Sequence, residues 1–187
     1  MIRMIRHGKP ASTWGGADDD PGLDETGHAQ ARAAAEALMA LPETERPGRV
    51  ISSPLRRCRE TAQPFADALG AAVEIDPRVG EIPTPKALTG EERPAWLRAA
   101  FGARWGEIEG DLDYADWAAG VAAAVAEYEG CAVFSHFVAL NAAVGTAVGD
   151  DRAVVFRPDH ASITVFEVKD GRLSLVEQGA EASTQVL

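Results

Sequence analysis

Residues 1–8, Met1-Ile-Arg-Met-Ile-Arg-His-Gly8, form a short apolar stretch that predicts a β-strand ending abruptly in Arg6, His7 and Gly8. In open α/β sheets, ligands bind at the carboxyl ends of the strands. There a guanidinium offers a planar fork that fits phosphate oxygens, and a neutral imidazole can act as a nucleophile. Glycine lets the backbone approach closely where a side chain would block it. Alone, such a tripeptide is more often an ordinary strand end, so its meaning depends on the rest of the chain.

Three later stretches place reactive side chains just after further predicted strands. The stretch Ser52-Ser-Pro-Leu-Arg-Arg57-Cys-Arg-Glu-Thr61-Ala62 follows a second strand at residues 49–52. A third strand at residues 72–75 precedes Glu81, and a fourth at residues 131–135 precedes His136. Because the carboxyl ends of parallel strands meet at one edge of a sheet, we expect these side chains to gather at that edge.

Helical spacing of apolar residues separates the predicted strands. The alternation predicts an α/β fold, a three-layer α/β/α sandwich with a mixed, mostly parallel sheet. Further strands are expected at residues 152–156, 162–168 and 172–177, with a hairpin turn between the last two. Ser53-Pro54 is typical of a helix start, with serine as the N-cap.

The order of these motifs resembles the histidine phosphatase (phosphoglycerate mutase-like) superfamily. Arg6-His7-Gly8 is followed by an S-x-L-x-R-x-x-x-T-A pattern from Ser53 to Ala62 and by the distant His136. Leu23-Asp-Glu-Thr-Gly27-His-Ala-Gln30-Ala31 is similar to that family's L-T-x-x-G-x-x-Q-A segment, with Asp24 in place of the usual threonine. The resemblance runs from the first strand to the C-terminal strands, and four ordered motifs are unlikely to coincide by chance.

The resemblance implies a metal-independent phosphomonoesterase that acts on a small phosphorylated metabolite. His7 would attack phosphorus and form a phosphohistidine, and Glu81 would act as the general acid. Guanidinium groups and an imidazolium would hold the phosphoryl oxygens, which supplies positive charge without a metal. The phosphate-binding set implied in this way is Arg6, Arg57, His136, Thr13 and the backbone N–H of Phe137.

The chain departs from the family pattern at two positions. Phe137 follows His136 where relatives usually carry glycine, so a bulky ring is expected next to the pocket. Lys9 follows Gly8 where mutases typically have glutamate, which favours a phosphatase over a mutase. His160 lies where many relatives have asparagine, and it is expected to approach the pocket as a supporting group.

Several alternatives remain open at this point. Glu91, Glu92 or Glu107 could replace Glu81 as the acid if the segment that carries them folds over the site. The activity could be that of a phosphoglycerate mutase-like phosphotransferase, or the protein could bind a phospho-ligand without catalysis. A phosphoprotein substrate also stays open.

Length and composition set further bounds. The 187 residues suit a single domain, in which residues 82–130 carry no recognisable motif and are interpreted as a helical lid or insertion. Within it, Trp96 and Trp105 are expected either to wall the pocket or to pack in the core. No cluster in the sequence has convincing metal-ligand spacing, and neither a metal nor another cofactor is expected.

Charge and cysteine content narrow the partners and the compartment. The formal net charge of −11 makes nucleic acid and anionic membranes poor partners, so a phosphate ester would need a local basic pocket. Cys58 and Cys131 cannot form a disulfide framework and are interpreted as buried thiols. The chain opens directly with a strand and has no long apolar run, so neither a signal peptide nor a membrane span is expected. These features favour a cytoplasmic protein.

Overall fold

The computed structural model describes residues 1–12, 18 and 20–182. Within this part of the chain the strands are β1 (Ile2–Arg6), β2 (Arg49–Ser52), β3 (Val73–Ile75), β4 (Cys131–Ser135), β5 (Ile163–Lys169) and β6 (Arg172–Glu177). They form one sheet in the order β3-β2-β4-β1-β5-β6. The first four strands pair in parallel, and β5 and β6 are antiparallel to their neighbours. The sheet is therefore mixed, as predicted.

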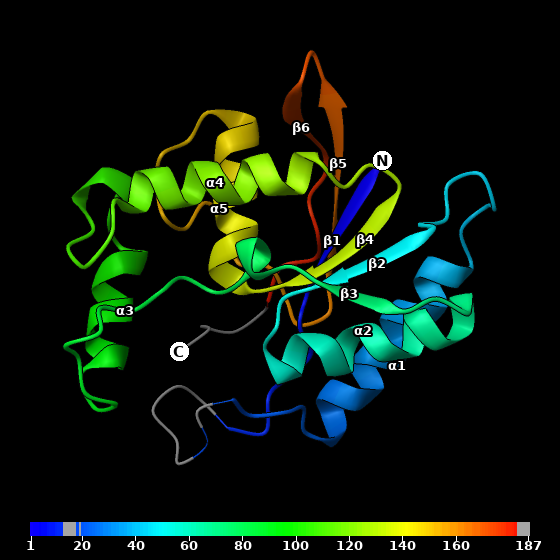
Figure 1. Cartoon of the computed structure of the whole chain (residues 1–187), viewed down its shortest axis with the longest axis horizontal. Helices are drawn as coiled ribbons and strands as arrows, with labels where there is room; N and C mark the ends of the chain where they lie inside the picture. Colours follow the sequence, from blue (N-terminus) through cyan, green and yellow to red (C-terminus); the bar gives the residue numbers. More distant parts are fainter. Residues whose placement is uncertain (13–17, 19, 183–187) are drawn as a thin grey trace.

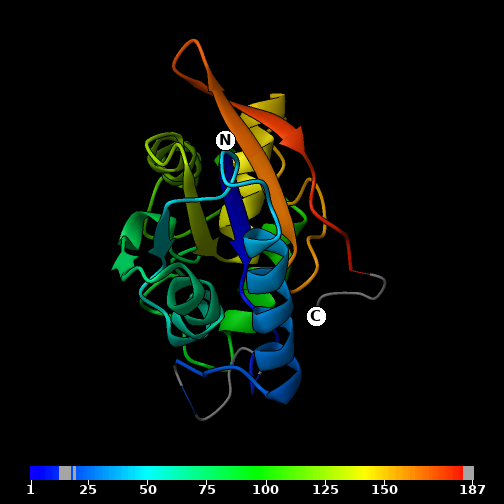
Figure 2. The same cartoon turned by 90° about the vertical axis from the view of Figure 1, so that its right-hand side faces the viewer.

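The helices cover both faces of this sheet. They are α1 (Glu25–Met39), α2 (Arg56–Leu69), α3 (Arg93–Phe101), α4 (Tyr114–Ala126) and α5 (Phe137–Val148), with short 3-10 turns η1 (Pro77–Val79) and η2 (Trp105–Glu107). Figure 1 shows α1 and α2 together on one side of the sheet, α4 and α5 on the other, and α3 apart from both pairs. The turned view in Figure 2 shows the hairpin of β5 and β6 projecting beyond the helices.

Alternation along the central strands explains the layers. Successive side chains of a strand point to opposite faces of the sheet. In β4, Val133 packs in the apolar cluster formed with α4 and α5, whereas Phe134 packs in the cluster formed with α1 and α2. In β2, Ile51 and Val50 divide in the same way. Apolar runs buried on both faces thus produce the predicted α/β/α sandwich.

The segment 82–130, interpreted from the sequence as a lid, has two structural parts. Helix α4 packs on α5 and contributes Val121 and Val125 to the core, so it belongs to a helical layer rather than to a lid. Helix α3 stands apart from the two helix pairs in Figure 1, although Ile82, Leu97 and Trp105 pack in the same apolar cluster as α4 and α5.

Trp96 and Trp105, the two tryptophans expected either to wall the pocket or to pack in the core, pack within the segment 82–130. Trp105 is buried and its ring centroid lies 5.7 Å from that of Trp117. Trp96 stacks on Tyr114 at 5.5 Å, and its Nε1–H donates to the carbonyl of Glu109 at 2.7 Å. These contacts favour the packing interpretation of both side chains over the pocket-wall interpretation.

Residues 152–156, predicted as a strand, form an irregular connection instead. The backbone N–H groups of Val155 and Phe156 donate to Oδ1 of Asn141 at 2.8 and 3.0 Å. A buried side-chain amide thus satisfies donors that a sheet ladder would otherwise have to satisfy. Apolar composition predicted a strand here, and it could not reveal this alternative acceptor.

The start of α2 also differs from the prediction. The helix begins at Arg56, and its N-cap is Leu55, which makes no side-chain capping bond. The Ser53 hydroxyl lies instead 2.7 Å from the imidazole of His136. The expected helix cap is therefore a neighbour of the candidate site.

Candidate active site

The register of the sheet brings the two histidines together. Arg6 at the end of β1 pairs with Ser135 at the end of β4, so His7 and His136 follow directly on neighbouring parallel strands. The backbone N–H of His7 donates to the Ser135 carbonyl at 2.9 Å. The two imidazole rings lie edge to face with centroids 5.3 Å apart. Residues far apart in the sequence thus share one edge of the sheet, as predicted.

The hydrogen bond of His7 identifies which ring nitrogen can react. Nδ1 lies 2.8 Å from the carbonyl oxygen of Gly8. A carbonyl only accepts, so Nδ1 carries the proton and Nε2 keeps its lone pair. Burial lowers the pKa of His7 well below 6.5, and the nearby His136, Arg57 and Arg6 lower it further. The ring is therefore neutral, which is the form a nucleophile requires.

Thr61 connects the nucleophile loop to α2. Its Oγ1 accepts the backbone N–H of Gly8 at 2.9 Å and donates to the carbonyl of Arg57 at 2.6 Å. One buried hydroxyl thus holds the loop after β1 against the first turn of α2. This contact gives a structural reason for the spacing of four residues between Arg57 and Thr61 in the S-x-L-x-R-x-x-x-T-A motif.

Arg6 is buried and held from two sides. Its Nη1 donates to the Pro158 carbonyl at 2.8 Å, and its guanidinium lies 5.3 Å from the ring centroid of Phe137. Its Nε is buried and makes no hydrogen bond to the described part of the chain. Burial lowers the pKa of Arg6 to about 10, against the raising effect of Glu81 and Asp159. A buried cation with an unused donor favours an anionic ligand here.

His136 is neutral in this structure, and the expected imidazolium, which would hold a phosphoryl oxygen, stays a prediction. Nη2 of Arg57 lies 3.1 Å from its Nδ1, and a guanidinium only donates. Burial lowers the pKa of His136 well below 6.5, and Arg57 and Arg6 lower it further. In the ligand-free site, the positive charge therefore resides on the two arginines.

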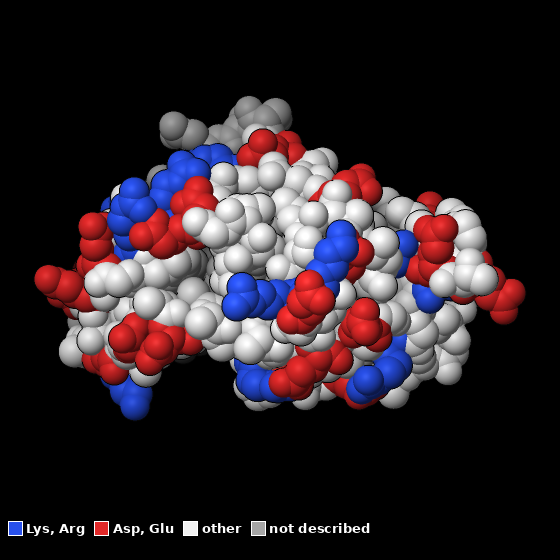
Figure 3. Space-filling model, turned by 90° about the horizontal axis from the view of Figure 1, so that it is seen from above, with Lys and Arg blue, Asp and Glu red and all other residues white. Residues whose placement is uncertain are grey.

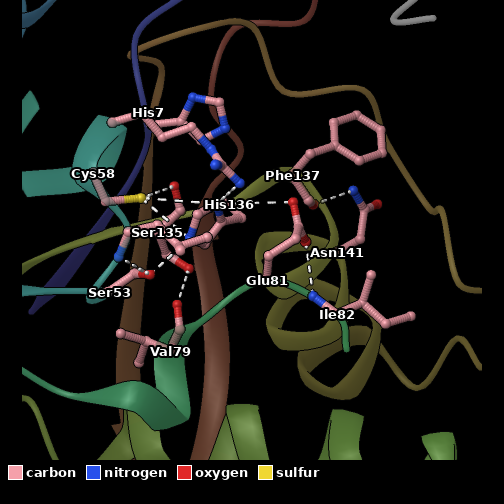
Figure 4. A network of polar contacts seen from close by, with 12 residues as sticks. His7, Ser53, Cys58, Val79, Glu81, Ile82, Ser135, His136, Phe137 and Asn141 are labelled. Carbon is pink, nitrogen blue, oxygen red and sulfur yellow. Dashed lines mark hydrogen bonds and ion pairs between the residues drawn. The ribbon is translucent and has the colours of Figure 1, made fainter. Parts of the chain in front are cut away.

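Glu81 reaches the same cluster from the loop after η1. Its Oε2 lies 3.8 Å from Nδ1 of His136, and its Oε1 accepts the backbone N–H of Ile82 at 3.0 Å. The hydroxyl of Ser135 fixes this loop by donating to the Val79 carbonyl at 2.7 Å. Figure 4 shows Glu81 beside His136, with His7 and Phe137 on opposite sides of the pair. Burial raises the pKa of Glu81, although Arg57, the Ile82 N–H and Arg6 oppose the shift, so the environment shifts this carboxyl towards its protonated form.

The site thus combines a histidine that can act as a nucleophile, two arginines, a second histidine and a buried acid. Comparison with known proteins identifies the family that this chain belongs to. The family model of the histidine phosphatase superfamily (branch 1) matches residues 2–181. The chain belongs to this superfamily.

Relatives within the superfamily have more than one activity. A 2,3-bisphosphoglycerate-dependent phosphoglycerate mutase from Thermoplasma acidophilum is 30% identical over 181 residues, which covers 91% of this chain and 88% of that protein. A solved mycobacterial glucosyl-3-phosphoglycerate phosphatase superposes with a TM-score of 0.70 at 22% identity, covering 97% and 99% of the two chains. A phosphoserine phosphatase from Entamoeba histolytica gives 0.72 at 20% identity, covering 97% of each chain. At these identities, the structural likeness shows the fold alone.

The remaining predicted site residues of this superfamily member have different outcomes. Thr13 lies outside the described residues. Phe137 opens α5, and its ring covers the Arg6 guanidinium while stacking on Phe101 of α3 at 5.3 Å. Phe101, rather than Trp96 or Trp105, is thus the aromatic side chain by which α3 reaches a ring at the site. Lys9 pairs with Asp24, the N-cap of α1, at 2.8 Å.

His160 lies closer to the nucleophile than the sequence could show. Its ring centroid is 6.0 Å from that of His7. Burial, and next the charge of Arg6, lower its pKa to about 4, so it is neutral at neutral pH. The turn that carries it also contacts the strand end, because the backbone N–H of Ala161 donates to the Arg6 carbonyl at 3.0 Å.

Two contributions were missed by sequence analysis. Ser53 was expected to cap a helix, and Cys58 was read only as a buried thiol. The Cys58 sulfur lies 3.3 Å from both the Ser135 carbonyl and Nε2 of His136. Their positions inside the S-x-L-x-R-x-x-x-T-A motif were the one signal available.

Among the described residues, no group of three or more His, Cys, Asp or Glu side chains is arranged to hold a metal ion.

Proposed function

We propose that the protein is a metal-independent phosphomonoester phosphatase that acts on a small phosphorylated metabolite through a phosphohistidine intermediate. The observation that carries this proposal is the state of His7. Its proton is held on Nδ1 by the Gly8 carbonyl, so the Nε2 lone pair is available, and the charges of Arg57 and Arg6 act on the ring. An unprotonated imidazole surrounded by cations is suited to attack an anionic phosphoryl group.

The first chemical step transfers the phosphoryl group to the protein. Nε2 of His7 forms a bond to phosphorus while the bond from phosphorus to the leaving oxygen breaks. Glu81 gives its proton to that oxygen, and its raised pKa makes the protonated form available. Arg6 and Arg57 neutralise the charge on the non-bridging oxygens.

The second step releases phosphate. Glu81, now a carboxylate, takes a proton from water as the water oxygen attacks phosphorus. The bond to His7 breaks, inorganic phosphate leaves, and Glu81 is protonated again. One residue thus acts as acid and then as base, so no second titrating carboxylate is required.

Surface charge is consistent with a small substrate. On the face in Figure 3, lysine and arginine side chains are interspersed with aspartate and glutamate, without a broad basic area. In the described part of the chain, no helix combines the length and the apolar character needed to cross a membrane. A pocket with two buried arginines provides the local positive charge that a phosphate ester needs against the net charge of −11.

Quenching a radiolabelled phosphomonoester reaction with a denaturant at alkaline pH tests this function. The wild-type protein should carry acid-labile, base-stable label, and His7→Ala should carry none while keeping its circular dichroism spectrum. Turnover should persist in excess chelator. Turnover without labelled histidine, or loss of turnover that a divalent ion restores, would contradict the mechanism.

A mutase is the second candidate, because a 30% identical relative is named as one. It predicts interconversion of phosphoglycerates when a bisphosphoglycerate primer is supplied, with little free phosphate. The ion pair of Lys9 with Asp24, at the position where mutases typically carry glutamate, favours the phosphatase. Product analysis with phosphoglycerates separates the two activities.

A further inference from the structure

A buried hydrogen-bond chain runs behind His136, away from the nucleophile. Ser53 and His136 are both 0% exposed, and Ser53 Oγ lies 2.7 Å from Nε2 of the imidazole. The Ser53 hydroxyl also hydrogen-bonds the sulfur of Cys58, whose thiol donates to the Ser135 carbonyl at 3.3 Å. Figure 4 shows Ser53, Cys58 and Ser135 grouped around His136.

Donor and acceptor roles determine where the proton of His136 lies. Arg57 can only donate to Nδ1, which it approaches at 3.1 Å, so Nδ1 is the acceptor nitrogen of a neutral ring. The proton must then be on Nε2, where Ser53 Oγ accepts it. Ser53 Oγ also lies 3.3 Å from the backbone N–H of Leu55. The serine that was expected to cap α2 therefore selects a tautomer.

This tautomer creates a requirement when substrate binds. Nδ1 faces Arg57 and, at 3.8 Å, the carboxyl of Glu81, so it is the nitrogen on the side of the reacting groups. A lone pair there repels an anionic phosphoryl oxygen, which can only accept. Nδ1 must gain a proton to become a donor to that oxygen, and the imidazolium then needs an acceptor at Nε2 as well.

We propose that Ser53 is a positioning residue that keeps one proton of His136 on Nε2. Nδ1 then takes up a second proton when the substrate dianion binds, and its N–H donates a hydrogen bond to the phosphoryl group. The inference rests on the proposed function, because it assigns the state of His136 within the same site. The proton comes from solvent and returns to solvent when phosphate leaves.

The groups around His136 explain why uptake is coupled to binding. Arg57 and Cys58 face the ring from α2, Arg6 and His7 face it from the end of β1, and Glu81 faces it from the loop after η1. In the ligand-free site the two arginines oppose a further positive charge. A bound phosphoryl dianion neutralises them and removes that opposition.

Nitrogen-15 NMR of the ligand-free protein tests the tautomer without any variant and without turnover. Nδ1 of His136 should show the resonance of an unprotonated nitrogen and Nε2 that of a protonated one, and saturating inorganic phosphate should convert Nδ1 to the protonated form. A ligand-free ring protonated on Nδ1, or one unchanged by bound phosphate, would overturn the proposal. Absence of phosphatase activity would overturn the proposed function and leave the ligand-free tautomer measurable.

Proton uptake and pH dependence test the role of Ser53. Calorimetric titration with inorganic phosphate at pH 8, in two buffers of different ionisation enthalpy, should show proton uptake by the wild type and less by Ser53→Ala. The fall of kcat at alkaline pH reports the loss of a proton from the enzyme–substrate complex. The pH at which kcat falls should be lower in Ser53→Ala than in the wild type, and Ser53→Thr should keep the wild-type value.

Ser52→Ala is the control, because it removes a buried hydroxyl that donates to the Ser53 carbonyl and leaves the Ser53 side chain in place. It should keep the tautomer of the wild type and the pH at which kcat falls. A fall in kcat for Ser53→Ala without any change in proton uptake or in that pH would assign Ser53 a packing role and reject the proposal.

Discussion

Gly8 and Gly27 face each other so closely that neither can carry a side chain. A Cβ on Gly8 would lie 2.6 Å from the carbonyl oxygen of Gly27, and one on Gly27 would lie closer still to the carbonyl oxygen of Lys9. The loop after the nucleophile thus packs backbone to backbone on the first turn of α1. Asp24 fixes that turn by accepting the N–H of Gly27 at 2.7 Å. The segment around Gly27 therefore positions the nucleophile loop.

Gly27→Ala should destabilise the protein by roughly 2–4 kcal/mol and lower kcat, because the new methyl forces the His7 loop away from α1. Gly120→Ala in α4 is the control, since a Cβ there meets nothing within 4 Å. It should stabilise the protein by up to about 1 kcal/mol through helix propensity. Urea unfolding measures both variants, and a neutral Gly27→Ala would contradict the close packing.

Asn141→Leu should cost about 2–5 kcal/mol of folding free energy. The variant keeps the number and branching of the side-chain heavy atoms but leaves the N–H groups of Val155 and Phe156 without their acceptor. Thr146→Leu on the exposed side of the same helix should stay within about 0.5 kcal/mol of the wild type. If denaturant unfolding gave equal values for the two variants, a buried role for the Asn141 amide would be wrong.

Glu81→Gln should slow alkyl phosphates by about 10²–10⁴-fold and activated aryl phosphates much less, because poor leaving groups need the acid most. Arg57→Ala removes charge stabilisation from the phosphoryl group itself, so it should slow both substrate classes similarly. Single-turnover formation of phosphohistidine is the measurement, because it excludes the later hydrolysis step. Equal slowing of both classes by Glu81→Gln would transfer the acid role to Glu91, Glu92 or Glu107.

His160 should make the protein sensitive to acid. Its folded-state pKa of about 4 lies below the unfolded value of 6.5, so the folded chain binds fewer protons between these two values. The stability from this group is full above about pH 6.5 and is lost as the pH falls towards 4. Between pH 7 and 4, the wild type should lose on the order of 1–3 kcal/mol more unfolding free energy than His160→Asn.

Denaturant unfolding at a series of pH values measures this difference. His28→Asn, which removes an imidazole that is half exposed, is the control. An acid loss as large in His160→Asn as in the wild type would show that other groups, such as His7 and His136, account for it.

Part of the candidate site was predictable because three of its residues stand at strand ends. Arg6, His7 and His136 stand directly after apolar runs, and parallel strands end at one edge of a sheet. Arg57 was selected by its distance from Thr61, which the structure explains through the Thr61 hydroxyl. Glu81 could be narrowed only by a short pattern, because a loop rather than a strand carries it.

Other features depended on partners that local patterns cannot show. Residues 152–156 have the composition of a strand, but Asn141 supplies acceptors for their backbone from a separate helix. Ser53 has the local pattern of a helix cap, but its hydroxyl serves an imidazole 83 positions away. At residues 152–156 a tertiary hydrogen bond replaces the local pattern, whereas Ser53 keeps a local bond to the Leu55 N–H at 3.3 Å and gains a tertiary one.

The sequence by itself determined the α/β/α fold and the main residues of the candidate site, because strand period, helix period and motif order can be read along the chain. The tertiary structure alone decided the protonation of the site. Which nitrogen of His136 holds the proton depends on Arg57 and Ser53, and the neutral state of His7 depends on burial beside two guanidinium groups. Such properties arise only when distant residues are brought within hydrogen-bond distance and removed from water.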